Sequence, residues 1–278
     1  MSVTISASDV NKLRQQTGAG MMDCRKALME SDGDFEKAID YLRLHGQKVA
    51  AKREDREAKE GVVIAKTNAD NTKGVLVNLS AETDFVSKNQ DFIDFAQSLA
   101  DIALAGDINT IDELKAANMD GATVADKLLE VVAKIGEKID IVKYEVMTAT
   151  AVVAYIHSGY RIGVLVSMNK AANEAITEAG RDAAMQIAAM NPLAVNAEGI
   201  SQETIDREKA LAIEQIKAEG KPADMAEKIA MGKLNKFFKD NTLLDQPFVK
   251  DSGVTVGAYL NSVDKGLTVT AFNRIAVG

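Results

Sequence analysis

The chain has 278 residues, of which 46 % are hydrophobic, and its formal net charge is −8 with a pI near 5.0. This composition is typical of a folded protein with buried cores, and the acidic balance argues against direct binding to nucleic acid, which relies on Lys and Arg to neutralise phosphates. The single cysteine, Cys24, excludes a disulfide framework and predicts a reducing, cytoplasmic location, and with only two histidines it is a poor basis for a zinc site.

Residues 1–46 predict three short helices. Ser6, with Asp9 three positions later, resembles a capping box and begins the first helix, which the segment 17–20 ends. The second helix follows, and the third ends at Gly46. The third carries apolar residues at the spacing of an amphipathic helix, namely Phe35, Ala38, Ile39 and Leu42.

The segment 48–60 is crowded with charges of both signs and is typical of a solvated linker. We place the end of the first domain, residues 1–54, inside it. Beyond it, residues 62–77 (VVIAKTNADNTKGVLV) align without a gap with residues 151–166 (AVVAYIHSGYRIGVLV), and Gly74 matches Gly163. Each copy has two β-branched runs around a polar turn, which predicts a β-hairpin.

The same alignment continues into helices, where residues 92–105 match residues 181–194. The repeated unit is therefore a hairpin, a connector and a helix. Since each copy has one apolar sheet face and one apolar helix stripe to bury, each predicts a small α+β subdomain. We assign residues 55–145 to the first subdomain and residues 146–278 to the second.

The connectors of the two copies differ. The first, residues 81–89, holds Phe85 in a polar, acidic loop, whereas the matching residues 170–178 of the second copy have no aromatic residue. A scaffold residue is expected in both copies, so Phe85 is a candidate for a protruding side chain. The alternative is that Phe85 covers the core beneath its loop.

Residues 201–239 predict a helical hairpin inserted into the second subdomain, with a turn at Gly220-Lys221-Pro222. Residues 246–249 and 267–272 predict strands that rejoin the second sheet. The apolar side chains expected to join the two helices are Ile205, Leu211, Ile213, Ile216, Met225, Ile229 and Leu234.

Motifs of reactive or membrane-bound proteins are missing from the sequence. Gly220-Lys221 lacks the upstream glycine and the hydroxyl residue of a phosphate-binding loop, and no Gly-x-Ser-x-Gly elbow occurs. The N-terminus does not resemble a signal peptide, and the longest apolar-rich run, Ala149–Ile156, is far shorter than the roughly 20 residues that span a bilayer. We therefore expect no enzymatic activity, no cofactor, no bound metal and no membrane anchor.

Five motifs, in order along the chain, carry a resemblance to a known family. They are residues 17–28 (TGAGMMDCRKAL), 82–86 (ETDFV), 133–137 (AKIGE), 161–166 (RIGVLV) and 246–249 (QPFV). Together they resemble the bacterial elongation factor Ts family. The resemblance implies an N-terminal three-helix bundle that is ubiquitin-associated-like (UBA-like), two related α+β subdomains, and a helical hairpin, or coiled coil, that projects from the second. Some members have a further C-terminal helix, and since this chain ends at Gly278 after the last predicted strand, we expect that contact to be absent.

The resemblance implies a guanine-nucleotide exchange factor that binds elongation factor Tu and promotes release of GDP during translation elongation. In the family, the Thr-Asp-Phe-Val segment is associated with displacement of Mg²⁺ from the partner, which implicates Thr83, Asp84, Phe85 and Val86. Phe85 is expected to wedge between helices of the partner's G domain. Asp84 is expected to perturb the hydrogen bonds near the metal.

Further contacts follow from the resemblance at Arg14, Met21, Met22 and Arg25, which match family positions that touch the G domain. Methionines adapt to irregular grooves, although for one of these two core packing within the bundle is the alternative. Arg25 stands where Lys is commoner in the family, which keeps the charge but changes the hydrogen-bond geometry.

Two other positions complete the expected contacts. Ile135 lies in the AKIGE motif and is expected to support Phe85, with simple burial as the alternative. His157 is expected as a contact, but some family members have the histidine where this chain has Ser158, and an ordinary polar turn residue is the alternative.

Other classes of function fit the residues less well. A general adaptor, with the bundle binding a peptide or ubiquitin-like protein and the α+β core forming a homodimer, gives no reason for an Asp84-Phe85 pair in only one repeat copy. A hydrolase lacks carboxylates clustered beside a nucleophile in a recognisable motif. The sequence favours a protein partner over a nucleic acid and leaves open whether two copies associate as a homodimer.

Overall fold

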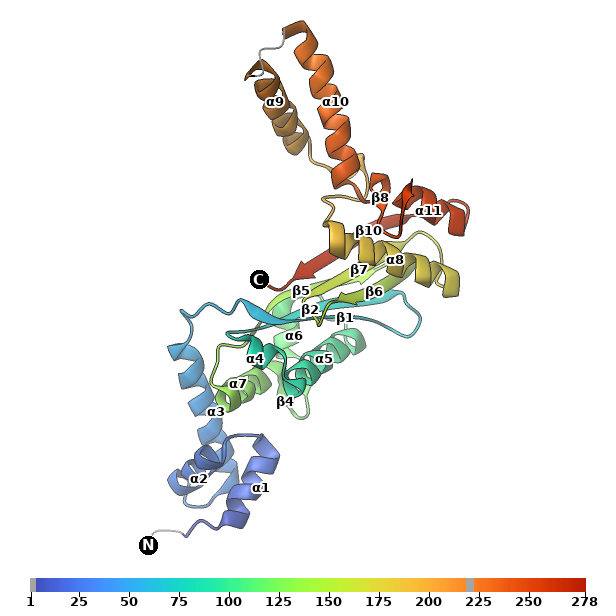
Figure 1. Ribbon diagram of the computed structural model, residues 1–278. Helices are drawn as coiled ribbons and strands as arrows, with labels where there is room; N and C mark the ends of the chain where they lie inside the picture. The colour runs from blue at the N-terminus through green and yellow to red at the C-terminus, as the bar shows by residue number, and fades with distance from the viewer. Residues whose placement is uncertain (1–3, 219–222) are drawn as a thin grey trace.

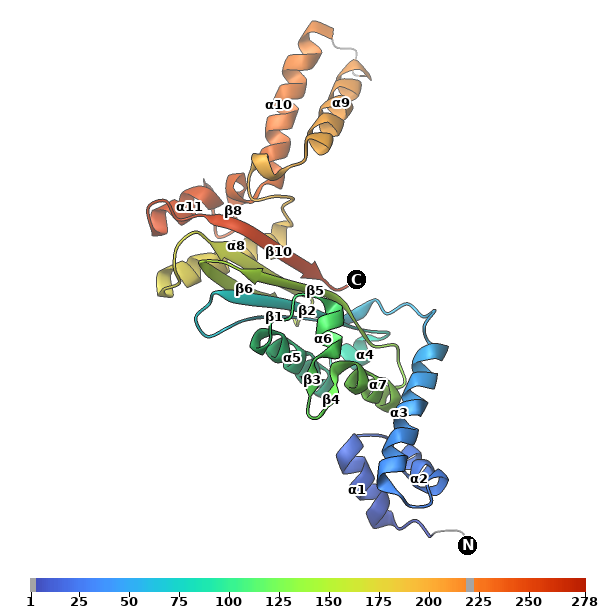
Figure 2. The same cartoon turned by 180° about the vertical axis from the view of Figure 1, so that it is seen from behind.

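The computed structural model describes residues 4–218 and 223–278. It mixes helices and strands, which confirms the α+β prediction. The molecule is elongated, with three helices at its N-terminal end, a pair of long helices at the opposite end, and two three-stranded sheets between them (Figures 1 and 2). The turn predicted at Gly220-Lys221-Pro222 lies outside the described residues. Among the helices that are described, none is long and apolar enough to cross a membrane.

The N-terminal bundle consists of α1 (Ala7–Thr17), α2 (Met21–Glu30) and α3 (Phe35–Lys52). The Asp9 N–H donates to the Ser6 hydroxyl at 3.1 Å, which caps α1, and Gly18 ends this helix in the left-handed conformation, with φ of 67°. The bundle core contains Val10, Leu13, Ala19, Cys24, Ala27, Leu28, Ala38 and Leu42. The prediction that Gly46 ends the third helix is wrong, because α3 continues through it.

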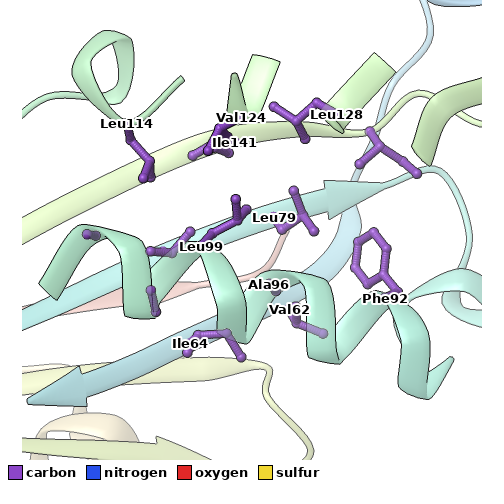
Figure 3. Packing of buried hydrophobic residues seen from close by; sticks show 14 of the residues in the cluster. Val62, Ile64, Leu79, Phe92, Ala96, Leu99, Leu114, Val124, Leu128 and Ile141 are labelled. Atoms are coloured by element: carbon purple, nitrogen blue, oxygen red, sulfur yellow. The ribbon is translucent and has the colours of Figure 1, made fainter. Parts of the chain in front are cut away.

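The first sheet has the strand order β1-β2-β5, with antiparallel neighbours. Its strands are β1 (Glu60–Thr67), β2 (Lys73–Ala81) and β5 (Asp140–Thr148). The remaining elements of this half are α4 (Asp84–Ser87), α5 (Gln90–Ala105), α6 (Ile111–Ala116), β3 (Asn118–Met119), β4 (Ala122–Thr123) and α7 (Val124–Ile135). Figure 3 shows apolar side chains of the helices and the sheet in one core, where Phe92 is fully buried. Since β5 continues to Thr148, the boundary predicted between residues 145 and 146 falls inside a strand.

The second sheet has the order β10-β7-β6. Its strands are β6 (Ala151–His157), β7 (Ile162–Met168) and β10 (Val269–Ala276). The other elements are α8 (Glu174–Met190), η1 (Ala197–Gly199), η2 (Leu243–Asp245), β8 (Pro247–Phe248), β9 (Asp251–Thr255) and α11 (Val256–Val263). α8 ends at Met190, four residues before the end of the helix predicted for residues 181–194, because Asn191 adopts a φ of 46° and Pro192 follows it. Each half thus has a hairpin followed by a helix, as the repeat predicts.

The two sheets pack face to face through a separate apolar layer that contains Val63, Ala65, Leu76, Met147, Val152, Leu165 and Ile275. The glycines matched in the repeat lie at this layer. A Cβ at Gly74 would come within 2.7 Å of Val152 Cγ1, and one at Gly163 within 2.5 Å of Val63 Cγ1. The shared glycines therefore allow the sheets to approach each other, which gives a physical reason for their recurrence.

The helices α9 (Gln202–Ala218) and α10 (Ala223–Asn241) form the predicted hairpin and project away from the second sheet (Figures 1 and 2). The apolar contact between them contains Ala212, Ile213, Ile216, Ile229 and Ala230. Leu211 was expected at this contact, but it is 46 % exposed, so that expectation is wrong.

Candidate protein-binding site

Phe85 lies on α4, a single helical turn between β2 and α5. Its side chain is 85 % exposed, so it does not cover the core beneath the loop. Its neighbours show why: Val86 packs against the first-sheet core and Ser87 is buried. Successive side chains of a helical turn point about 100° apart, so a turn that buries Val86 and Ser87 directs Phe85 to solvent.

Glu137 fixes the start of this turn. Its carboxylate accepts hydrogen bonds from the Glu82 N–H at 3.1 Å, the Thr83 N–H at 3.0 Å and the Thr83 hydroxyl at 2.7 Å. Glu137 reaches the turn because Gly136, with a φ of 77°, ends α7 in a conformation that glycine adopts without strain. The AKIGE motif therefore anchors the Phe85 turn through its glutamate.

A second carboxylate, that of Glu82, ties the same turn to the linker after α3. Arg53 donates to Glu82 Oε1 at 2.7 Å, and the Lys138 N–H donates to the same oxygen at 2.7 Å. Burial acts to raise the pKa of Glu82, but the hydrogen bonds from Lys138 and Arg53 outweigh it and hold this pKa below its usual value. Glu82 is therefore ionised near neutral pH and acts as a fixed acceptor.

Asp84 faces solvent beside Phe85. Lys88 donates to Asp84 Oδ2 at 2.7 Å, one helical turn away, and this hydrogen bond and charge lower the pKa of Asp84. The surface of the turn thus presents an aromatic ring next to an ionised carboxylate.

The N-terminal bundle presents a second exposed apolar group. Met21 and Met22 begin α2 and are 53 % and 72 % exposed, so neither packs in the bundle core. Arg14 and Arg25 are also exposed. A hollow of about 370 Å³ between α1 and α2 is lined by Ile5, Ala7, Val10, Asn11, Met21, Met22 and Arg25. Exposed, adaptable methionines around a hollow are suited to contact with another protein.

A lysine of α7 connects the bundle to the region of the Phe85 turn. Lys134 Nζ lies 3.2 Å from Asp91 Oδ2, at the start of α5. The same side chain lies next to the α1–α2 loop, where a Cβ at Gly18 would be 3.6 Å from Lys134 Cδ.

The structure separates the remaining predicted contacts from the exposed group. Ile135 is half-buried and packs against the first-sheet core, as Val86 of the Phe85 turn does. His157 is half-buried at the end of β6, where its Nδ1 lies 2.9 Å from the Tyr155 hydroxyl, and Ser158 in the following turn is exposed. The predicted contacts that are exposed are thus Phe85, Met21, Met22, Arg14 and Arg25, together with the Asp84 side chain beside Phe85.

Sequence reasoning missed the anchoring residues Arg53, Glu137 and Lys138. Glu137 stood in a motif that the family resemblance singled out, but that motif pointed to Ile135 instead. Arg53 was one of many charges in the linker, and nothing in the sequence distinguished it from its neighbours.

No group of three or more His, Cys, Asp or Glu side chains in residues 4–218 and 223–278 is arranged to hold a metal ion. The lone thiol, Cys24, is buried in the bundle, and burial raises its pKa.

Comparisons with known proteins identify the family. The family model for "Elongation factor TS" matches residues 82–278. The chain is 52 % identical over 275 residues to elongation factor Ts of Flavobacterium psychrophilum, with 99 % of each chain covered. It is 51 % identical to elongation factor Ts of Christiangramia forsetii, again over 99 % of each chain, and 43 % identical to that of Porphyromonas gingivalis, over 100 % of this chain and 99 % of the relative.

The mixed α and β fold, with the ETDFV turn held at its surface, and these matches together define a translation elongation factor. The family model covers more than half of the chain, and the relatives cover nearly all of it. Both identify the same family. The chain belongs to the elongation factor Ts family.

Proposed function

We propose that this protein is a guanine-nucleotide exchange factor that binds elongation factor Tu·GDP and promotes release of GDP, so that GTP can bind. The observation that carries the proposal is the exposed ring of Phe85 on a turn held by Glu137 and Glu82. Large aromatic side chains on rigid supports are the usual anchors of protein interfaces. In this proposal Phe85 wedges into the partner's G domain.

The physical basis of exchange is a difference in affinity. A bound nucleoside diphosphate depends on backbone N–H groups around its phosphates and on Mg²⁺ that offsets their charge. A protein that displaces the metal and moves one of those backbone groups weakens several contacts together. If it binds the empty partner more tightly than the filled one, linkage requires that it lower the partner's affinity for GDP by the same factor.

Such a mechanism assigns positioning, and no bond-making chemistry, to the residues of this chain. Thr83 and Val86 hold the turn, Phe85 and Asp84 act on the partner near its Mg²⁺ site, and Met21, Met22, Arg14 and Arg25 form a second contact on the G domain. Ile135 supports the turn from the core, and His157 is a peripheral contact at the β6–β7 turn. The protein is then a non-enzymatic factor that acts in the cytoplasm and reaches translation through a protein partner.

The proposal extends to the architecture. We infer that the N-terminal bundle is a UBA-like domain of residues 1–54, that α9 and α10 form a coiled coil, and that the two α+β subdomains meet near residues 149–150, in the turn between β5 and β6. The side chains shared between α9 and α10 and the separate bundle core support these assignments.

The test is the affinity of the purified chain for elongation factor Tu in two states, nucleotide-free and GDP-bound, measured by calorimetry. We expect the nucleotide-free state to bind at least about 100-fold more tightly, which corresponds to a coupling free energy of about 3 kcal/mol. Equal affinities for the two states would refute the proposal, since a ligand with no preference shifts no equilibrium.

A further inference from the structure

Gly46 occupies an unusual place, in the interior of the long helix α3. Glycine destabilises helix interiors, and Gly46 is not among the glycines with a positive φ, so backbone conformation does not require it. Space does. A Cβ at Gly46 would lie 2.5 Å from the carbonyl oxygen of Leu129 and 3.3 Å from Ala133 Cβ, both on α7. The two helices cross at a distance that only glycine permits.

The crossing joins the two exposed groups of the candidate site. α3 begins in the bundle core, with Ala38 and Leu42, and ends against the first-sheet core, with Val49 and Ala50. α7 ends at Gly136, directly before the glutamate that anchors the Phe85 turn. α3 is therefore part of the bundle whose helix α2 presents the methionines, and α7 leads directly to the anchor of the Phe85 turn.

Further contacts between the bundle and α7 lie on the bundle side of Gly46. Arg43 Nε lies 3.9 Å from Glu130 Oε1, one turn before Gly46. Thr17 and Ala19 of the bundle line a shallow hollow together with Glu130 and Ala133 of α7. The bundle therefore contacts α7 directly and is not held by the linker alone.

We propose that Gly46 is a positioning residue that holds the bundle and the Phe85 turn as one preorganised, two-point binding surface. The inference rests on the proposed function: both points contact a single guanine-nucleotide-binding protein. When two contacts have a fixed separation, binding at one makes binding at the other intramolecular, and no ordering cost remains for the second. If the two helices no longer cross closely, the bundle and the Phe85 turn lose their fixed separation.

The test compares Gly46→Leu with a matched control, Gly232→Leu. Gly232 also lies inside a long helix, α10, but a Cβ there meets nothing within 4 Å. We expect Gly46→Leu to weaken binding of elongation factor Tu by about 10-fold or more, and Gly232→Leu to leave it unchanged. Thermal unfolding shows whether each variant folds. If Gly46→Leu does not fold, Gly46→Ala, which introduces only the Cβ, replaces it.

A double-mutant cycle separates positioning from general damage. In the wild-type background Met22→Ala and Phe85→Ala should each weaken binding. In the Gly46→Leu background Met22→Ala should cost less than about 2-fold, because the methionine no longer reaches the partner, while Phe85→Ala should retain its effect. If Met22→Ala costs as much in both backgrounds, Gly46 does not position the bundle.

A measurement without any partner keeps this inference separate from the proposed function. Spin labels on Lys26→Cys in α2 and Asp112→Cys in α6, both exposed positions, report the distance between bundle and core, and the buried Cys24 is shielded from labelling. We expect one narrow distance distribution in the wild-type background and a broad or shifted one with Gly46→Leu. An unchanged distribution overturns the inference even if exchange activity is found, and failure of the wild type to bind elongation factor Tu overturns only the proposed function.

Discussion

Substitution of Glu137 is the most direct way to perturb the Phe85 turn. Glu137 supports the turn through hydrogen bonds but is not part of its exposed surface. Glu137→Ala removes the acceptor of three hydrogen bonds, from the Glu82 N–H, the Thr83 N–H and the Thr83 hydroxyl. Phe85 and the apolar core are left unaltered. The variant therefore tests whether the exposed ring must be held in place.

The structure sets the size of the effect. A hydrogen bond to a charged acceptor contributes about 1.5–3 kcal/mol when the groups are buried. The three groups here are half-buried, so water replaces part of what is lost, and we expect the native conformation of the turn to lose about 2 kcal/mol in total. A turn destabilised by about 2 kcal/mol can lower the apparent affinity for a partner by up to about 30-fold, since only the ordered fraction binds.

The assay is the rate of GDP release from elongation factor Tu as a function of the concentration of the variant. We expect Glu137→Ala to need about 10- to 30-fold more protein for half-maximal acceleration, with a smaller change in the rate at saturation. Glu113→Ala is the matched control, because Glu113 also accepts two backbone N–H groups, from Asn109 at 2.7 Å and Thr110 at 3.0 Å, at the start of α6. A Glu137→Ala variant that matches wild type would refute the claim that the anchored turn is needed.

Two further predictions concern the linker and the first core. Arg53→Met should weaken acceleration of GDP release by about 3- to 5-fold, less than Glu137→Ala, because Glu82 keeps the Lys138 N–H as a donor. The control Lys59→Met, in the same segment, should have no effect. Equal losses in both variants would contradict the role of Arg53 as an anchor of the turn. Burial raises the pKa of Tyr144 to about 12, so the folded state keeps this phenol neutral while the unfolded chain ionises it above about pH 10. The free energy of unfolding should therefore fall as the pH rises from about 10 towards 12, with this group contributing about 1 kcal/mol of the loss at pH 11. Thermal unfolding should show a shallower loss of stability with pH in Tyr144→Phe. An equal dependence of stability on pH in the two proteins would contradict this prediction.

Much of the architecture followed from local patterns in the sequence. The hairpins and their matched glycines were visible because strands and tight packing impose residue types at fixed spacing. The exposure of Phe85 was indicated by comparison of the two repeat copies, although the residues alone left burial as an alternative. The helix stripe of α3 was also correct, since a 3.6-residue period is a local property.

Three of the failures depend on how segments distant in the sequence pack together. Gly46 ends a helix by local preference, yet α3 continues because α7 packs against that glycine. Leu211 fits an apolar stripe, but the partner helix does not cover it. The role of Glu137 depends on a turn more than fifty residues earlier in the chain, and no periodicity in the sequence connects the two.

The measurement that tests the central claim most directly is release of fluorescently labelled GDP from elongation factor Tu in millimolar Mg²⁺, with wild-type protein and with Phe85→Ala. Wild type should strongly accelerate release. Phe85→Ala should lose about 3 kcal/mol of that effect, or about 100-fold, as expected for an aromatic anchor at the centre of an interface. Acceleration by Phe85→Ala equal to that of wild type would contradict the wedge, and no acceleration by wild type would contradict the proposed function itself.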